Sequence, residues 1–486
     1  MSFLHSFALL LSLALTAYAD STPTTITVAG VPITIDGTTI SVPSSSTADS
    51  AGLASIPLAS AAAVACALTS LDIGSAYVES SGSEYESTVE NTWNLFNSFD
   101  SPSCIVYPES SAHVQSAMKN IYRMGAKYAV QAGAHSAMVG WNSITDGVLI
   151  SFARMDTTTY NPTTDTITVL PGVRWGEAAD AVQEFGVSAI GGRASDVGTG
   201  LLLGGGISFM SPLYGWSADR IKEMDVVLVT GDLLTVSATN QYADLFQALK
   251  GGANRFGIVT RYGLHAAHTG TKDDKEWFGG VISYPGSAAQ ALSDASAKYI
   301  RETTDPKAAI PSTSQTLSPL SYHDISHLIP GDARGSGQQF GASSIVGDEA
   351  LYWDAYTHFR NFSNAFTPTS LASSFFILSP IPSFQWSASG GGENAMGSPG
   401  VSYGAINYWL IYQPTVKSKP QAVQEGFELL FQQAPSTPGV PLYVNEADAS
   451  QNSFATYPNY AKLQATYAKY DPLRFNVLHT EGPIGL

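Results

Sequence analysis

The stretch Gln131-Ala-Gly-Ala-His-Ser136 decides how this 486-residue chain is interpreted. The segment 128–131 is predicted as a strand, and it leads into a loop of small residues that ends at His135. Small side chains let backbone N–H groups approach a phosphate closely. An isolated histidine is more often structural, but a histidine that closes such a loop can carry a covalently attached flavin.

A second glycine cluster, Gly204-Gly205-Gly206, follows three leucines. Consecutive glycines favour close approach of the backbone to a ligand, although a flexible turn gives the same pattern. No G-x-G-x-x-G fingerprint follows an N-terminal strand, which argues against a nicotinamide-binding Rossmann domain.

The run from Gly191 to Trp216, GGRASDVGTGLLLGGGISFMSPLYGW, resembles the FAD-binding segment of the vanillyl-alcohol-oxidase/PCMH superfamily. Within that superfamily the chain is most similar to the berberine-bridge-enzyme-like oxidases, particularly the fungal FAD-linked oxidoreductases. Segments 244–252, 256–260, 443–448 and 469–472 match in the family's order. The resemblance extends from about Cys66 to the C-terminus.

This resemblance implies FAD as the cofactor, bound through residues in four segments. His135 matches the histidine that carries FAD, and Gln131 stands where the family usually has an arginine. The family's cysteine for a second attachment is absent near Ala194, so we expect a single link through His135. The complete set of expected cofactor-binding residues is Gln131, Ala132, Gly133, Ala134, His135, Ser136, Gly198, Gly204, Gly205, Gly206, Gly257, Ile258, Val259 and Asn445.

The resemblance also implies hydride transfer from a substrate C–H bond to flavin N5, with O2 as reoxidant. A base must remove the accompanying proton, and the candidates are Tyr214, Tyr443 and Glu446. Core packing is the alternative for each tyrosine. A buried glutamate suits a base better, because loss of solvent raises its pKa.

We expect an α+β fold. A PCMH-type FAD-binding domain of two α/β subdomains is predicted at 60–270, and a substrate domain with a helix-covered antiparallel sheet at 271–440. Residues 441–486 are expected to return to the FAD domain. Residues 1–19 are interpreted as a signal peptide and 20–59 as a flexible Ser/Thr-rich extension.

Local patterns predict individual elements of this fold. Apolar residues at helical spacing between 114 and 124 predict a helix from Ser110 or Ser111 to Gly125. Further helices are expected at about 175–185, 288–300, 349–365 and 460–470. Strands are expected at 105–107, 128–131, 148–150, 166–170, 277–282, 375–378 and 442–446, with a hairpin at 226–236.

Composition limits the partners. The net charge of −17 disfavours nucleic acid and anionic membranes. The flavin chemistry that the resemblance implies makes a small-molecule substrate and O2 the expected partners, and we expect a monomer. The apolar run 7–15 and Ala17-Tyr-Ala19 predict secretion, because the run is too short for a membrane anchor.

Secretion has two chemical consequences. Cys66 and Cys104 most simply form one disulfide in an oxidising compartment, the alternative being two buried free thiols. Asn361 lies in an N-x-S sequon and is a candidate glycosylation site if it is exposed.

No metal site is expected. His323 and His327 have the i, i+4 spacing of a zinc-binding helix, but a third ligand is absent from the motif.

The predicted function is oxidation of a small natural product, such as a polyketide or alkaloid, in secondary-metabolite biosynthesis. The alternatives are a secreted oligosaccharide oxidase, for which Trp353, Tyr356, Trp386 and Trp409 are candidate sugar-stacking residues, and a flavoprotein oxidative cyclase. A binding or storage protein is disfavoured by the ordered flavin motifs.

Overall fold

The computed structural model describes residues 26–28, 31–35, 38–40, 58–279, 286–303, 318–329, 334–367, 369–388 and 394–486. The predicted signal peptide lies outside these residues. Strands β1 (Ile26–Val28), β2 (Val31–Ile35) and β3 (Thr38–Ile40) form a small antiparallel sheet. This part of the extension, expected to be flexible, therefore contains regular structure, since its Ile, Val and Thr residues favour strands.

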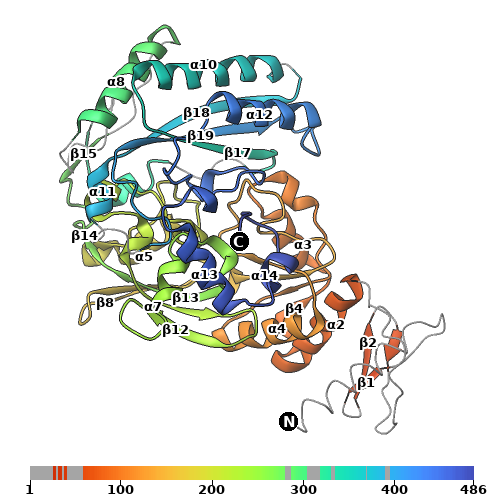
Figure 1. The fold of residues 1–486 in the computed structure, drawn as a ribbon. Helices are drawn as coiled ribbons and strands as arrows, with labels where there is room; N and C mark the ends of the chain where they lie inside the picture. Colours follow the sequence, from red (N-terminus) through yellow and green to blue (C-terminus); the bar gives the residue numbers. More distant parts are fainter. Residues whose placement is uncertain are drawn as a thin grey trace.

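The first subdomain is built on a four-stranded sheet in the order β4 (Val78–Glu79), β5 (Cys104–Val106), β7 (Val148–Ser151) and β6 (Tyr128–Gln131). Strand β7 runs parallel to both β5 and β6. Helices α2 (Leu58–Ile73), α3 (Ser83–Glu90) and α4 (Ser111–Met124) belong to the same subdomain (Figure 1). The Cys66–Cys104 disulfide joins α2 to β5, as predicted.

Helix α4 confirms the boundaries read from the sequence. The Ser110 side chain accepts a hydrogen bond from the His113 backbone N–H at its start, and Gly125 ends it in the left-handed region at φ 62°. Its apolar face, including Val114 and Ile121, is fully buried against the core of this subdomain.

The second subdomain contains a five-stranded antiparallel sheet. Its strand order is β12 (Leu233–Ser237), β11 (Ile221–Val227), β13 (Ile258–His265), β9 (Thr166–Val169) and β8 (Thr158–Asn161). The β11–β12 pair is the predicted hairpin. Helices α5 (Trp175–Val182), α6 (Ser211–Tyr214) and α7 (Ala243–Leu249) and the pair β10 (Val187–Ser188) and β14 (Ala267–His268) complete it.

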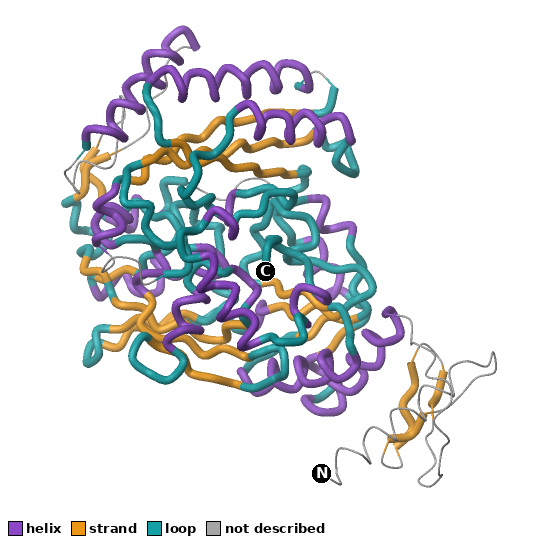
Figure 2. The backbone as a smooth tube through the Cα atoms, in the orientation of Figure 1, coloured by secondary structure: helices purple, strands orange, loops and turns teal. Residues whose placement is uncertain are grey.

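In the segment expected to form the substrate domain, three antiparallel strands make one sheet, called the substrate sheet below, in the order β17 (Gln338–Ile345), β19 (Tyr403–Tyr412) and β18 (Leu371–Ile381). Helices α8 (Ala289–Glu302), α10 (Glu349–Phe366) and α12 (Gln421–Gln433) cover one face, as expected (Figure 1). The loops between this sheet and the FAD-binding sheets are coloured teal in Figure 2. Smaller elements are β15 (Trp277–Gly279), β16 (Ser318–Leu320), α9 (Tyr322–Ser326) and α11 (Ser383–Ala388).

The C-terminal segment contains helices α13 (Tyr460–Tyr470), which contacts α7 of the second subdomain, and α14 (Phe475–His479), whose Phe475 packs in the core of the first subdomain. The strand predicted at 442–446 is wrong: the segment is a loop that ends in a single 3-10 turn, Val444–Glu446. Tyr443 bonds to the backbone of Ile207, in a loop, and Asn445 to that of Leu201, in the 3-10 helix Thr199–Gly204, so neither partner belongs to a neighbouring strand. Within the described ranges, no helix has the length and apolarity needed to span a bilayer.

Candidate cofactor and active site

A cavity of about 370 Å³ lies between the two FAD-binding subdomains and the sheet of the substrate domain. The first subdomain contributes residues of its 132–138 loop, and the second contributes residues 197–201 and the start of β13. The substrate sheet contributes Phe340, Ile377, Asn407 and Trp409, and the C-terminal segment contributes Tyr443, Asn445, Glu446 and Ala447. Both subdomains, the substrate sheet and the C-terminal segment therefore line the same cavity.

His135 lines the cavity and is held by its neighbours. Its imidazole stacks on the Trp93 indole, with ring centroids 4.1 Å apart and planes inclined by 15°. Ala134, just before it, has a left-handed φ of 61°, and its carbonyl accepts a 2.9 Å hydrogen bond from the Trp93 N–H. Burial lowers the pKa of His135 to about 4, although the Asp196 carboxylate opposes this shift. The imidazole is therefore neutral at physiological pH, the form in which it is a nucleophile.

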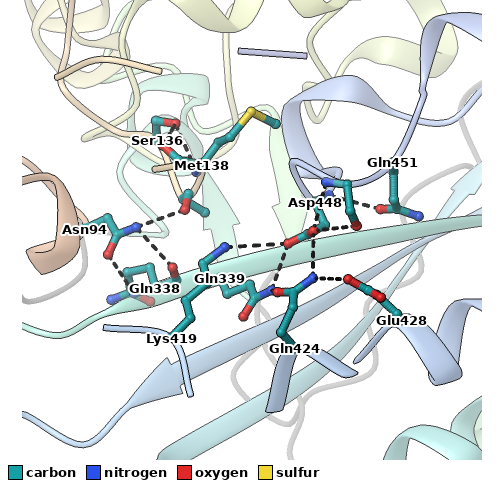
Figure 3. A network of polar contacts seen from close by, with 12 residues as sticks. Asn94, Ser136, Met138, Gln338, Gln339, Lys419, Gln424, Glu428, Asp448 and Gln451 are labelled. Carbon is teal, nitrogen blue, oxygen red and sulfur yellow. Dashed lines mark hydrogen bonds and ion pairs between the residues drawn. The ribbon is translucent and has the colours of Figure 1, made fainter. Parts of the chain in front are cut away.

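The His135 loop is anchored to the substrate sheet through Asn94. The Asn94 side chain donates to the carbonyls of Ala137 and Gln338 at 2.9 and 3.0 Å, and accepts from the Gln338 N–H at 2.8 Å. Figure 3 shows this bridge beside Ser136, whose hydroxyl accepts a hydrogen bond from the Met138 N–H. These bonds fix the loop relative to β17.

Two backbone segments of the cavity meet at glycines. A Cβ built on Gly133 would lie 2.6 Å from the Gly198 Cα, and a Cβ on Gly198 would lie 2.5 Å from the Gly133 N. Side chains at either position would push the two loops apart. Arg174 also holds the Gly133 loop, because its Nε donates a hydrogen bond to the Gly133 carbonyl at 3.4 Å.

Most of the predicted cofactor residues line this cavity together. They are Ala132, Gly133, Ala134, His135, Ser136, Gly198, Gly257, Ile258, Val259 and Asn445. Ala194, near the position of the family's second attachment, lines it as well.

Four predicted cofactor residues lie outside the cavity lining. The Gln131 amide is buried in β6, where it donates to the Thr88 carbonyl and accepts from the Ser151 hydroxyl. The glycine cluster 204–206 packs behind the cavity: a Cβ at Gly204 would lie 2.0 Å from the Asn445 Oδ1. Three consecutive glycines therefore serve close packing against protein side chains here.

Tyr214, one of the three candidate bases, is also absent from the lining. Its ring lies under the Arg220 guanidinium at 4.8 Å and packs near Tyr322. Core packing, the alternative considered for each tyrosine, describes this residue.

Tyr443 and Glu446 do line the cavity. The Tyr443 hydroxyl accepts hydrogen bonds from the Ile207 N–H at 3.1 Å and the Asn445 amide at 3.0 Å. Burial raises its pKa well above the ordinary value of 10. Tyr443 therefore keeps its proton at physiological pH and can donate it to a ligand.

Glu446 has the environment expected of a tuned base. Its carboxylate lies 3.7 Å from the Arg193 guanidinium. Burial raises the pKa of Glu446, while Arg193 and a hydrogen bond from the Asn407 side chain act in the opposite direction. A carboxylate with a raised pKa is a stronger base than an exposed one, which suits it to taking a proton from a ligand.

A buried network holds the Glu446 segment in place. Asp448 accepts a 2.8 Å hydrogen bond from the Gln339 amide and lies 3.7 Å from Lys419 Nζ (Figure 3). Burial works to raise the pKa of Asp448, but Lys419 and hydrogen bonds from Ser450 and Gln339 keep it below the ordinary value. Asp448 is therefore ionised and ties the segment to β17.

Sequence reasoning missed several cavity residues. Trp93 and Asn407 sit in no motif that we recognised, and Arg193 lies in the 191–216 run but was not expected to have a role; the three residues line one cavity only in the folded chain. Trp409 was noted as an aromatic candidate, and it lines the cavity while its indole N–H donates to Gln338. Trp386, by contrast, is buried against Trp216.

The residues present fit an FAD molecule. Among the described residues, four buried side-chain polar atoms on the cavity lining have no hydrogen-bond partner: Trp93 Nε1, Asn142 Nδ2, Asn254 Oδ1 and Asn407 Oδ1. Buried polar groups are normally paired, so these atoms indicate a polar ligand. The glycine contact at 133 and 198 and the neutral His135 add a close-approach loop and an attachment point.

Comparison with known proteins agrees with this geometry. Residues 102–237 match the model of the FAD binding domain. An uncharacterized FAD-linked oxidoreductase of Arthroderma benhamiae is 34% identical over 229 residues, covering 47% of this chain and 45% of that protein. The alignment therefore spans about half the length of such a relative.

Two further comparisons extend over most of the chain. The bifunctional solanapyrone synthase of Alternaria solani is 27% identical over 452 residues, covering 85% of this chain and 87% of that protein. The crystal structure of a glucooligosaccharide oxidase from Acremonium strictum superposes with a TM-score of 0.66 at 18% identity, covering 87% of this chain and 99% of that one. Residues 102–237 therefore form an FAD binding domain, about half of the chain is similar in sequence to fungal FAD-linked oxidoreductases, and the chain shares its fold with this oxidase.

Proposed function

We propose that this FAD-dependent oxidoreductase oxidises a small natural product, polyketide-like or alkaloid-like, with O2 as reoxidant. The observation that carries the proposal is the Glu446 carboxylate, buried in the same cavity as His135 and held between Arg193 and Asn407. Bound FAD supplies the hydride acceptor.

The cofactor is held by the 132–136 loop, Gly198, the segment 257–259 and Asn445. A single covalent link through His135 is supported by its neutral imidazole and by Ala194, which offers no thiol to a second link. Trp93 fixes the plane of the imidazole.

Glu446 acts as the base that removes the substrate proton. Arg193 balances the carboxylate, and Tyr443 donates a hydrogen bond that orients the substrate oxygen or nitrogen. The apolar wall of Phe340, Ile377 and Trp409 accommodates a hydrophobic ring system.

Oligosaccharide oxidation is the second candidate. Trp409 and Phe340 line the cavity with centroids 6.0 Å apart, an arrangement on which a sugar ring can stack. The fold shared with the glucooligosaccharide oxidase is compatible with either substrate class, because fold alone does not define chemistry. An oxidative cyclase, the third candidate, uses the same hydride step and differs in the fate of its product.

Secretion is part of the proposal. The Cys66–Cys104 disulfide supports an oxidising compartment, and Asn361 is exposed on α10, where a glycan can be attached. We also propose a monomer.

The test is peroxide production and oxygen consumption with a panel of aromatic polyketides, alkaloids and oligosaccharides. Glu446→Gln should lower turnover by about 10²- to 10⁴-fold with flavin content unchanged. Tyr443→Phe should lower it less, and Glu428→Gln, an exposed glutamate on α12, is the matched control. Wild-type turnover in both Glu446→Gln and Tyr443→Phe would overturn the assignment of the base. Turnover of oligosaccharides alone would favour the second candidate.

A further inference from the structure

The helix α9 carries two histidines that the proposed oxidoreductase chemistry does not use. His323 lies in α9 and His327 directly follows it, so their rings stand on one face with centroids 4.6 Å apart. Asp324, in the first turn of α9, does not serve as a third ligand, because its carboxylate accepts a hydrogen bond from the Ser321 N–H and pairs with the Lys275 ammonium. In sequence this pair lacks a third ligand.

The fold supplies that ligand from another domain. Asp180, on α5 of the FAD-binding domain, places Oδ1 2.7 Å from His323 Nε2 and 3.5 Å from His327 Nε2. The three ligand atoms all lie within 4.8 Å of one another. No local pattern could show this, because the carboxylate lies far from the histidines in sequence.

We propose that Asp180, His323 and His327 bind a divalent transition-metal ion, Zn²⁺ being the best match, at the junction of α5 and α9. Two imidazoles and one carboxylate leave a fourth position for water.

The orientation of His327 supports a metal ligand. Its Nδ1 lies 2.9 Å from the His323 carbonyl oxygen, which can only accept a hydrogen bond. Nδ1 is therefore engaged with the backbone, and Nε2 is the nitrogen that faces Asp180. A backbone carbonyl at the other ring nitrogen is a common partner of metal-binding histidines.

The distances suit a small ion. Zinc–ligand bonds of the usual length place neighbouring ligand atoms about 3.3 Å apart in a tetrahedron. The His327–Asp180 distance of 3.5 Å is close to this value. The His323–Asp180 pair, at 2.7 Å, must open by about 0.6 Å, which is feasible because the Asp180 side chain is 60% exposed.

The surface of α5 is shaped for His327. A Cβ at Gly176, one turn before Asp180, would lie 3.3 Å from His327 Nε2, so a larger residue would displace the ring. Two residues after His327, Ile329 accepts a hydrogen bond from the Ser195 N–H and lines the cofactor cavity. An ion at this site would therefore link α5 to α9 beside the wall of the cofactor cavity.

The test is zinc titration of the tag-free, full-length flavoprotein after chelator treatment, followed by isothermal calorimetry. We expect one Zn²⁺ per chain and a rise in unfolding temperature, with no such effect of Mg²⁺, which prefers oxygen ligands. Asp180→Asn and His327→Gln should weaken Zn²⁺ binding by about tenfold or more. His358→Gln is the matched control, because His358 faces Asp354 on α10 at 3.5 Å in an exposed pair that belongs to no such three-residue cluster among the described residues.

X-ray absorption at the zinc edge of the wild-type protein gives a readout that does not depend on any variant. Two imidazole ligands with oxygen ligands would support the site. Substoichiometric binding, equal loss in the His358→Gln control, binding that survives both ligand substitutions, or a spectrum without imidazole would overturn it.

Discussion

Replacing Gly198 with alanine should separate the two loops that form the cofactor cavity. The Gly198 backbone, at φ −92° and ψ −177°, is one that alanine adopts freely, so the substitution introduces only a methyl group. That methyl would lie 2.5 Å from the Gly133 N and 2.6 Å from its Cα. An ordinary contact begins at 3.4 Å, so the loops must part by about 0.9 Å.

Overpacking of this kind costs about 1–3 kcal/mol. If the whole cost falls on the cofactor-bound state, the non-covalent affinity for FAD drops by roughly 5- to 150-fold. The assay is FAD titration of apoprotein that also carries His135→Ala, which prevents attachment, with Gly286→Ala as the control. Gly286 is exposed and lies outside the cavity lining, and a Cβ there meets nothing within 4 Å, so that variant should bind as the parent does. Equal affinities in the two variants would refute the glycine-contact argument.

Three further predictions concern the base, the disulfide and a buried ion pair. Burial raises the pKa of Glu446, and a base acts in its deprotonated form, so kcat should fall as the pH drops through a value above the ordinary 4.5. Glu446→Gln should remove this acidic limb from the pH–rate profile. If the limb persists in the variant, another group causes it. The Cys66→Ser/Cys104→Ser double variant removes the disulfide that closes a loop with a sequence separation of 38, so its free energy of urea unfolding should fall by about 3–4 kcal/mol. An unchanged unfolding midpoint would contradict this. Lys250→Met should lower the free energy of urea unfolding by about 3–5 kcal/mol, because it leaves the buried Asp219 carboxylate, 3.4 Å away, without its cation. Adding Asp219→Leu to this variant should restore part of the lost stability. No recovery would show that the two residues are not coupled.

The sequence predicted the parts of the site that depend on short-range patterns. The loop around His135 and the α4 caps are encoded locally, in the order of small, polar and apolar residues, and the structure has them as predicted. The strand expected at 442–446 was wrong, because its apolar pattern is satisfied by contacts with loops.

Residues that act through long-range contacts could not be predicted. Trp93 reaches His135, and Arg193 reaches Glu446, only because separate subdomains close around one cavity. Tyr214 matched a family position, yet the fold packs it beneath Arg220. Asp180, the proposed third metal ligand, was missed for the same reason: His323 lies 143 residues away in the sequence.

The central claim is an FAD cofactor carried on His135 of this cavity. It is tested most directly by acid fluorescence of the denatured protein band, followed by mass analysis of the peptide that contains His135. The account predicts a fluorescent band and an FAD-modified His135 peptide, both lost in His135→Ala. A colourless protein with an unmodified His135 peptide would contradict the attachment and leave the fold without its proposed chemistry.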